Sequence, residues 1–364
     1  MNDQIVTSAK RGATLDGTTI DDRSATIERV TAAGLCMQCG TCAGMCPRAA
    51  ITMSWGTRSG YLPVVAHARC DACGDCVAVC PGEGFDYTPD AWWRSGNGDA
   101  PCQDFLGPWK GLWFGWATDE EVRYAGASGG VASAILKGAF EHDLIDAAVV
   151  VRMDPARPLA AEATIARSVD EILAGRGSKY NAVAINTVFR RILREPGRYA
   201  VVGLPCHVQG LRLAQRHLPA LAERIAFTLG IFCGWTALPR ATEVAARRAG
   251  VDPAELSAVA YRGPAWPGGL RLVTRSGRTV TRPYPDYFDR YVYAYTPPRC
   301  RLCPDALAEA ADISVGDAWL DRFAGTPGVS DVIARTDVGL GIIGEPAADH
   351  LTLDVATPAE IVAS

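Results

Sequence analysis

Near its N-terminus the chain reads Cys36-Met37-Gln38-Cys39-Gly40-Thr41-Cys42-Ala43-Gly44-Met45-Cys46-Pro47, and the spacing returns as Cys70-Asp71-Ala72-Cys73-Gly74-Asp75-Cys76-Val77-Ala78-Val79-Cys80-Pro81. Each cysteine of the second run follows its counterpart by 34 positions, so the segment is a short internal repeat. Two-residue spacers let one tight loop offer three thiolates to a cubane, and the fourth cysteine of each run ligates the other cluster. The spacing predicts a small α+β domain of the bacterial-ferredoxin type.

The spacing also predicts the ligands of two [4Fe–4S] clusters. One set is Cys36, Cys39, Cys42 and Cys80, and the other is Cys70, Cys73, Cys76 and Cys46. The alternative is zinc, which binds four thiolates at two Cys-x-x-Cys knuckles. Zinc does not need four cysteines in each run followed by proline, so clusters are the favoured interpretation. Such clusters transfer single electrons, and we expect the rest of the chain to contain the site of the chemistry.

Composition places the chain among ordinary globular proteins. It has 364 residues, a net charge of −4, 48% hydrophobic and 21% charged residues, which fits about two domains and excludes disorder. The acidic balance gives no reason to expect nucleic acid. No apolar run is long enough for a membrane span and no secretory signal is visible, so we expect a cytoplasmic protein with reduced thiols.

From about Trp113 onward, expected strands alternate with helices. Strands are expected at 147–152, 199–203, 225–232 and 312–315, a hairpin at 271–282, and helices at 129–143, 182–194, 208–216, 239–249 and 305–311. Alternation of this kind predicts an α/β body with a parallel or mixed sheet. The predicted organisation is an arm (1–33), the ferredoxin-like domain (34–90), a linker (91–112), and a body in two regions (113–195 and 196–364).

Five cysteines lie outside the repeat. Cys206 and Cys233 follow expected strands, at the sheet edge where open α/β sheets gather their sites. With Cys300 and Cys303 they provide four thiolates, enough for one more metal centre, and spacing alone does not separate a cluster from zinc. Cys102 stands alone and has no assigned role.

Six short motifs occur in the order typical of one family. They are Gly126-Ala127-Ser128-Gly129-Gly130-Val131-Ala132-Ser133, Gly177-Ser178-Lys179-Tyr180, Gly203-Leu204-Pro205-Cys206, Phe232-Cys233-Gly234, Cys300-x-x-Cys303 and Ala311-Asp312-Ile313-Ser314-Val315-Gly316-Asp317. Over residues 34 to 345 the chain resembles the beta subunit of coenzyme F420-reducing hydrogenase and its relatives, among them F420H2 dehydrogenase subunits and 7-hydroxymethyl chlorophyll a reductase. The resemblance implies a flavin-binding body with FAD, and a third [4Fe–4S] cluster on Cys206, Cys233, Cys300 and Cys303.

The resemblance also directs attention to the residues expected to contact the cofactor. These are Ser128, Gly129, Gly130, Ser133, Ser178, Lys179, Tyr180, Asn181, Gly316 and Asp317. A glycine-rich turn that opens a helix suits a phosphate, because free N–H groups and the helix dipole meet the anion there. Asp317 is equally well explained as a helix cap. His207 is a candidate proton donor, or else a hydrogen-bonded neighbour of a cluster ligand.

The function expected from these features is that of an iron–sulfur flavoprotein oxidoreductase, in which reduced coenzyme F420 or a similar hydride donor feeds electrons to the clusters. The loop Arg262–Gly269 is more similar to the chlorophyll-reductase branch, which favours a ferredoxin-dependent reductase of an unsaturated or hydroxymethyl substrate as the alternative. A third possibility is a non-catalytic electron-transfer subunit of a larger complex. Expected partners are a ferredoxin or a larger redox complex, coenzyme F420, and further copies of the chain. Arg190, Arg191, Arg194 and Arg198 form either a docking surface for such a partner or a solvated helix face.

Overall fold

The computed structural model describes residues 26–88, 102, 103, 105–287 and 293–364. Most of the expected arm and the first part of the expected linker lie outside these residues. The helices are α1 Glu28–Ala32, α2 Thr41–Met45, α3 Asp75–Ala78, α4 Glu120–Ala125, α5 Val131–Glu141, α6 Val169–Leu173, α7 Phe189–Arg194, α8 Pro205–His217, α9 Pro219–Arg224, α10 Pro239–Arg248, α12 Asp337–Ile343, α13 Glu345–Ala348 and α14 Pro358–Ala363. The strands are β1 Ile51–Gly56, β2 Gly60–Val65, β3 Cys102–Gln103, β4 Gly107–Pro108, β5 Gly111–Ala117, β6 Ala147–Asp154, β7 Arg157–Ala166, β8 Tyr199–Gly203, β9 Ile225–Ile231, β10 Leu256–Ala260, β11 Gly269–Thr274, β12 Thr279–Pro283, β13 Ile313–Asp317, β14 Ser330–Ala334 and β15 Leu351–Val355.

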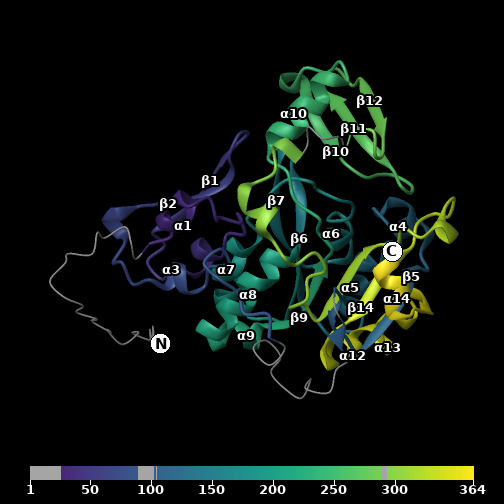
Figure 1. Ribbon diagram of the computed structural model, residues 1–364, viewed down its shortest axis with the longest axis horizontal. Helices are drawn as coiled ribbons and strands as arrows, with labels where there is room; N and C mark the ends of the chain where they lie inside the picture. The colour runs from purple at the N-terminus through teal and green to yellow at the C-terminus, as the bar shows by residue number, and fades with distance from the viewer. Residues whose placement is uncertain (1–25, 89–101, 104, 288–292) are drawn as a thin grey trace.

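An eight-stranded sheet forms the centre of the body, in the order β15-β5-β14-β13-β9-β8-β6-β7 (Figure 1). The four central strands β13, β9, β8 and β6 run parallel to one another. β7 at one edge, and β14, β5 and β15 at the other, pair antiparallel. The expected mixed sheet is confirmed.

Helices cover both faces of this sheet. The side chains of its central strands point alternately to the two faces, and each face has its own hydrophobic core. Along β6, Ala148 and Val150 pack in one core, together with buried residues of α5 and α12. Ala147 and Val149 pack in the other core, together with buried residues of α7, α8 and α9. Successive side chains of a strand point to opposite faces, so a strand covered on both sides reads as a continuous apolar run.

The cysteine repeat, with the short helix α1 before it, forms a small module that contains the strands β1 and β2 and the helices α1, α2 and α3. β1 and β2 pair antiparallel (Figure 1), and α2 contacts both α7 and α8 of the body. Backbone groups join the two parts, since the Asn186 N–H donates to the Cys39 carbonyl at 2.9 Å. The Arg190 guanidinium donates to the Cys46 carbonyl at 2.6 Å, and the Tyr61 hydroxyl to the Ala161 carbonyl at 3.0 Å. The module is therefore held firmly against the body.

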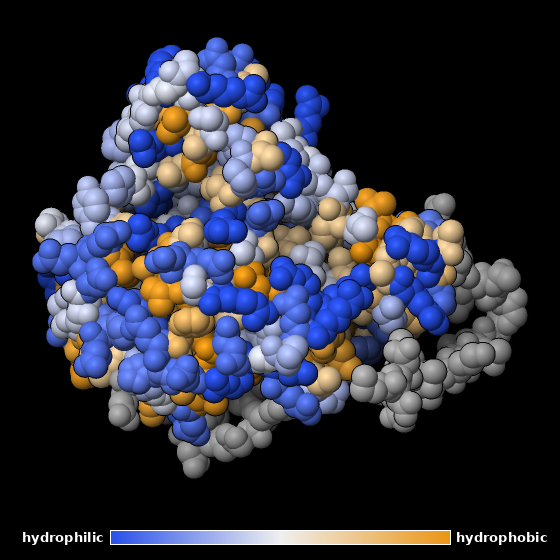
Figure 2. Space-filling model, turned by 180° about the vertical axis from the view of Figure 1, so that it is seen from behind, coloured by the Kyte–Doolittle hydropathy of each residue, from blue (hydrophilic) through white to orange (hydrophobic). Residues whose placement is uncertain are grey.

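A second lobe contains α10 and the three-stranded sheet β10-β11-β12. Its apolar residues pack in a core of their own, with Leu159 of β7. Figure 2 shows this lobe standing out from the body, and on this face hydrophobic residues occur as small patches among hydrophilic ones. Within the described residues, no helix combines the length and the apolar character that crossing a membrane requires.

Two expected helices are wrong in whole or in part. Residues 305–311 form no helix, because Ala308 has a left-handed backbone (φ 54°) and the Leu307 carbonyl accepts a bond from the Arg335 guanidinium at 3.0 Å. Residues 182–184 are not helical, since the backbone of Ala182 pairs with Ala237. The helix expected from residue 182 begins only at Phe189, after a 3-10 turn over Ile185–Val188.

Candidate redox site

The eight cysteines of the repeat form two groups within the module. Four of them, Cys46, Cys70, Cys73 and Cys76, line one small cavity of the module. The other four include Cys42, whose pKa is raised well above its usual value by burial and then by the charges of the remaining three, Cys39, Cys36 and Cys80. Each group takes the last cysteine of one run and three from the other. The structure thus brings together the members of each predicted ligand set.

The loops that present these thiols have matching backbone geometry. Gly40 and Gly74, at equivalent positions of the repeat, both have left-handed backbones, with φ of 83° and 82°. Gln38 and Ala72, also equivalent, have φ of 63° and 53°. Such alternation curls the chain tightly, and non-glycine residues in this region mark loops that the surroundings hold in place.

A donor set of four thiols around a cavity has the chemistry of an iron–sulfur site. Cluster binding requires thiolates, and iron compensates the negative charge that burial penalises. Within the described part of the chain, no three His, Cys, Asp or Glu side chains converge closely enough for a single metal ion. A cubane binds each thiolate at a different iron, so its ligands do not need to converge on one point. The residues present fit two [4Fe–4S] clusters.

The four distal cysteines also come together, from three separate segments. Cys206 lies in the first turn of α8, Cys233 follows β9, and Cys300 lies in a 3-10 turn with Cys303 directly after it. Burial raises the pKa of Cys206 well above its usual value, and the charges of Cys233, Cys300 and Cys303 add to the effect. We refer to these four residues as the third thiol site.

The three thiol sites follow one another through the molecule. Cys76 of the cavity set lies close enough to Cys42 to raise its pKa, and Cys39 has the same effect on Cys206. Cys73, in the cavity set, is the exposed member of the repeat. The set that contains Cys42 therefore lies between the exposed set and the third thiol site.

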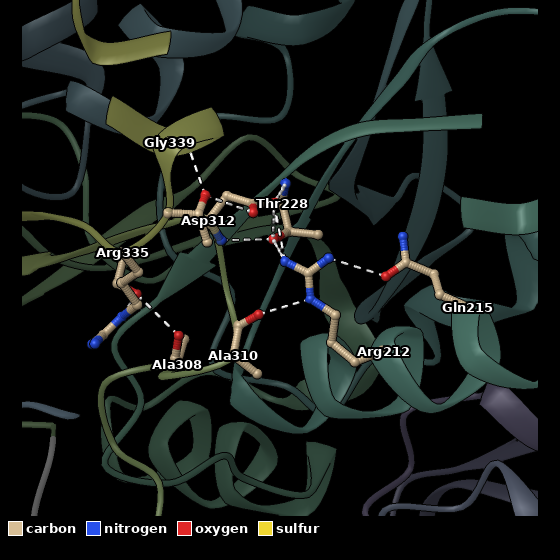
Figure 3. Close-up of polar contacts among 10 residues, drawn as sticks. Arg212, Gln215, Thr228, Ala308, Ala310, Asp312, Arg335 and Gly339 are labelled. Atoms are coloured by element: carbon tan, nitrogen blue, oxygen red, sulfur yellow. Dashed lines mark hydrogen bonds and ion pairs between the residues drawn. The ribbon is translucent and has the colours of Figure 1, made fainter. Parts of the chain in front are cut away.

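A buried polar network fixes the three segments that bring the third thiol site together (Figure 3). Arg212 in α8 donates to the Ala310 carbonyl at 2.9 Å and forms an ion pair with Asp312 at 3.1 Å. Asp312 in turn accepts two hydrogen bonds at 2.8 Å from Thr228 of β9, one from its N–H and one from its hydroxyl. The network joins the helix after Cys206, the strand before Cys233 and the segment after Cys303.

Arg262 connects most of the segments expected to bind the cofactor. Its guanidinium donates to the Tyr180 hydroxyl at 3.0 Å, to Asp317 Oδ2 at 2.9 Å and to the Ala127 carbonyl at 2.8 Å. Its side chain is only 1% exposed. Burial opposes the charge, but Asp317 and Tyr180 together outweigh that effect and raise the pKa of Arg262. Arg262 is thus a fixed cation at the meeting point of the expected cofactor segments.

Aromatic rings enclose this guanidinium. The Arg262 Cζ lies 4.3 Å from the ring centre of Tyr284, 4.9 Å from that of Trp266 and 5.6 Å from that of Trp319. Such packing favours a guanidinium over an ammonium. Sequence reasoning noted Arg262 and Trp266 only as part of a loop and missed Tyr284 and Trp319, which come from distant segments.

The glycine-rich turn lies where the prediction requires it, before α5. Gly130 (φ 77°) precedes the helix, and no side chain caps it. A Cβ on Gly129 would lie 2.4 Å from the Gly115 carbonyl oxygen, so only glycine fits. Ser128 donates to the Val329 carbonyl at 2.7 Å, which anchors the turn. Ser133 lies in the first turn of α5. The Gly129 N–H donates to Ser330 Oγ at 3.1 Å, so the turn packs against β5 and β14 and only the start of α5 is left without a side-chain cap.

The 178–181 segment lies near the third thiol site, with Asn181 buried and the three residues before it half-buried. Ala237, which follows Cys233 by four residues, donates its N–H to the Tyr180 carbonyl at 3.1 Å. Lys179 Nζ donates to the carbonyls of Arg176 at 2.8 Å and Gly177 at 3.0 Å, and burial lowers its pKa to about 7. Asn181 donates to the Leu159 carbonyl at 2.8 Å. Ser178 directly precedes Lys179 in this segment.

The two residues at the end of β13 have different roles. Asp317 does not cap a helix, because its carboxylate faces Arg262. Gly316 is required by packing, since a Cβ there would lie 1.9 Å from the Phe232 ring. Phe232 precedes Cys233, so the end of β13 also adjoins the third thiol site.

His207 has no ring nitrogen free for proton transfer. Its Nδ1 accepts the Leu204 N–H at 3.0 Å, and its Nε2 donates to the Val183 carbonyl at 2.8 Å. Burial lowers the pKa of His207 to about 4, so the ring stays neutral. The geometry corresponds to the structural alternative, a histidine that fixes the start of α8 beside Cys206.

The arginines at and after α7 are mostly engaged within the chain. Arg190 binds the Cys46 carbonyl, and Arg191 forms an ion pair with Glu195 at 3.2 Å. Arg198 forms an ion pair with Asp146 at 3.0 Å. These contacts favour the interpretation of the arginines as a solvated helix face over that of a docking surface for a redox partner.

Comparison with protein families assigns most of the chain. Residues 112–190 match the N-terminal part, and residues 197–359 the C-terminal part, of the family described as "Coenzyme F420 hydrogenase/dehydrogenase, beta subunit". Residues 35–84 match "4Fe-4S dicluster domain".

Individual relatives agree with these matches. Coenzyme F420 hydrogenase subunit beta of Methanosarcina barkeri is 28% identical over an alignment of 247 residues that covers 65% of this chain and 78% of the relative. An F(420)H(2) dehydrogenase subunit of Methanosarcina mazei is 28% identical over 222 residues, 58% of this chain and 56% of the relative. A chain of the F420-reducing NiFe hydrogenase complex from Methanosarcina barkeri has a similar fold, with a TM-score of 0.57 at 24% identity over 70% of this chain and 84% of that one.

Proposed function

The chain belongs to the coenzyme F420 hydrogenase/dehydrogenase beta-subunit family and includes a 4Fe–4S dicluster domain, and on this basis we propose that it couples hydride transfer at a bound FAD to one-electron transfer through three [4Fe–4S] clusters. The hydride donor would be reduced coenzyme F420 or a similar molecule, and the electron acceptor a ferredoxin or a larger redox complex. FAD, when bound, exchanges electron pairs with the hydride donor and single electrons with the clusters.

One observation supports this proposal above the others. Two segments expected to contact the flavin, 178–181 and the end of β13, both adjoin the Phe232–Ala237 stretch that contains Cys233. The third thiol site then adjoins Cys39 of the ferredoxin-like module. A flavin, the third cluster and the two module clusters would thus follow one another from the body to the exposed thiol Cys73.

The residues of the body would divide the binding of the flavin between them. In the turn at Ser128–Gly130 the Gly129 N–H is taken by Ser330 Oγ at 3.1 Å, so a phosphate would meet the backbone N–H groups at the uncapped start of α5. Arg262 holds this turn, Tyr180 and Asp317 in one arrangement. The Arg262 side chain is itself only 1% exposed at that junction.

The first experiment is anaerobic purification followed by flavin and iron analysis. We expect one FAD and about twelve irons per chain, since each [4Fe–4S] cluster contributes four. Reduced coenzyme F420 added anaerobically should bleach the flavin absorbance in a stopped-flow instrument. No bleaching despite a full cofactor load would contradict the hydride-donor assignment.

Two other outcomes would assign a different function. Flavin reduction by reduced ferredoxin, with no response to F420, would support a ferredoxin-dependent reductase, the function favoured by the Arg262–Gly269 loop. Full iron content without bound flavin would support a non-catalytic electron-transfer subunit.

A further inference from the structure

A buried hydroxyl contacts one cluster ligand at the junction between the module and the body. Thr41 Oγ1 lies 3.2 Å from the sulfur of Cys39, and Thr41 is fully buried. Thr41 follows Cys39 by two positions, and Asp75 holds the equivalent position in the second run. The repeat therefore places a neutral hydroxyl beside one cluster and an acid beside the other.

The direction of this hydrogen bond is set by Asn186. The Asn186 amide nitrogen donates to the His207 carbonyl at 2.9 Å, which fixes the amide orientation because a carbonyl can only accept. The same nitrogen lies 2.8 Å from Thr41 Oγ1 and donates to it. Because the Thr41 oxygen accepts this hydrogen bond, the hydrogen of the same hydroxyl is free to be donated to the Cys39 sulfur. A ligating thiolate can only accept.

We propose that Thr41, oriented by Asn186, raises the reduction potential of the cluster held by Cys36, Cys39, Cys42 and Cys80, and so sets the electron-transfer step between that cluster and the third one. The inference rests on the proposed function, because it requires Cys39 to be a cluster ligand. A hydrogen bond to a cluster sulfur stabilises the reduced, more negative state, so it raises the potential. Asn186 contacts residues next to both clusters of this step. It donates to Thr41, which contacts Cys39, and to the carbonyl of His207, which directly follows Cys206.

Tight packing leaves the hydroxyl little freedom to leave this position. A Cβ on Gly210 of α8 would lie 2.2 Å from Thr41 Oγ1. Asn186 is also held by its backbone, whose N–H donates to the Cys39 carbonyl at 2.9 Å. Thr41 and Asn186 are positioning residues in this scheme, since neither would bind iron.

The test is a potentiometric titration of the anaerobic holoprotein followed by EPR. Thr41→Val keeps the shape of the side chain and removes the hydroxyl, so the midpoint of one cluster should fall while the other two stay unchanged. We expect about a tenfold change in the electron-exchange equilibrium between this cluster and the third, which corresponds to 59 mV for one electron. Thr41→Ser should restore the wild-type midpoint. Asn186→Leu should lower the same midpoint by a smaller amount.

The matched control is Thr187→Val. The Thr187 hydroxyl donates to the Ala184 carbonyl at 2.8 Å, and the side chain packs near the same loop, within 2.9 Å of where a Cβ of Gly40 would lie. Unchanged midpoints in Thr41→Val with full iron content, or an equal shift in Thr187→Val, would overturn the inference. Iron and flavin analysis of the same samples tests the proposed function separately. If the proposed function is wrong, the wild type itself will lack iron or flavin.

Discussion

Arg262 is the residue on which the expected cofactor segments depend most. An Arg262→Lys variant keeps a positive charge but loses the planar fork that serves Tyr180, Asp317 and the Ala127 carbonyl together. We expect retained FAD to fall at least fivefold, with iron content unchanged. Flavin and iron analysis after anaerobic gel filtration measures both. The control is Arg271→Lys, an exposed residue of β11. Equal flavin content in the Arg262 variant and the wild type would remove Arg262 from the binding of the cofactor.

Asp331 introduces a pH dependence of stability. It is buried in β14, its Oδ1 has no partner among the described residues, and burial raises its pKa from 3.8 to about 7. Between the unfolded pKa of 3.8 and the folded pKa of about 7, the folded state binds more protons than the unfolded one. Asp331 therefore makes the free energy of unfolding fall as pH rises. The free energy of unfolding of Asp331→Asn, relative to the wild type, should therefore increase by about 1.4 kcal/mol from pH 6 to pH 8.5.

Anaerobic denaturant unfolding at the two pH values measures this gain. Asp354→Asn, at an exposed position of β15, is the control and should show no comparable gain. A difference between the Asp331 variant and the wild type that is the same at both pH values would show that the buried carboxyl does not titrate in this range.

At the scale of elements, the contact of α2 with the body fixes the ferredoxin-like module. A Cβ on Gly44 would lie 2.0 Å from the Asn186 carbonyl oxygen. The equivalent position of the second run is Ala78, so the cysteine loop itself tolerates a methyl group there. Gly44→Ala should thus spare the local fold but loosen the junction. We expect faster hydrogen exchange in 41–45 and 185–194, with the rest of the body protected as before.

Gly84→Ala provides the control for this element. A Cβ on Gly84 meets nothing within 4 Å, so its exchange pattern should equal that of the wild type. Unaltered exchange in both variants would mean that the module and the body do not depend on the close approach at Gly44.

At the scale of the whole molecule, the third thiol site connects the body with the module. Cys206→Ser should remove about four irons per chain and leave about eight, since the module contains its own ligands. Electrons that reach the flavin as hydride would then have no third cluster through which to pass to the module. Reduction of the remaining clusters by reduced F420 should therefore slow at least a hundredfold. Iron analysis and freeze-quench EPR measure the two effects. An unchanged iron content, or zinc in the native protein, would contradict the third cluster.

Several features of the fold were accessible from sequence because they depend on local order. The strands at 199–203 and 225–231 are short apolar runs between polar segments, and both were expected within one residue of their observed ends. The antiparallel strands β7, β14 and β15 were not expected. Their place in the sheet is decided by pairing with segments far away in the chain, and a local pattern does not specify this pairing.

The candidate site divides in the same way. The cysteine spacing alone predicted the two ligand sets of the module, because a two-residue spacer limits how far a thiol can reach. Only the tertiary structure brought Arg262, Tyr180 and Asp317 together, and placed Thr41 and Asn186 between two thiol sites. Contacts of this kind join residues that are tens or hundreds of positions apart, and the order of the chain sets neither their distance nor their burial. The sequence by itself determined which chemical groups are available, and the packing of the sheet and the module decided which of them meet.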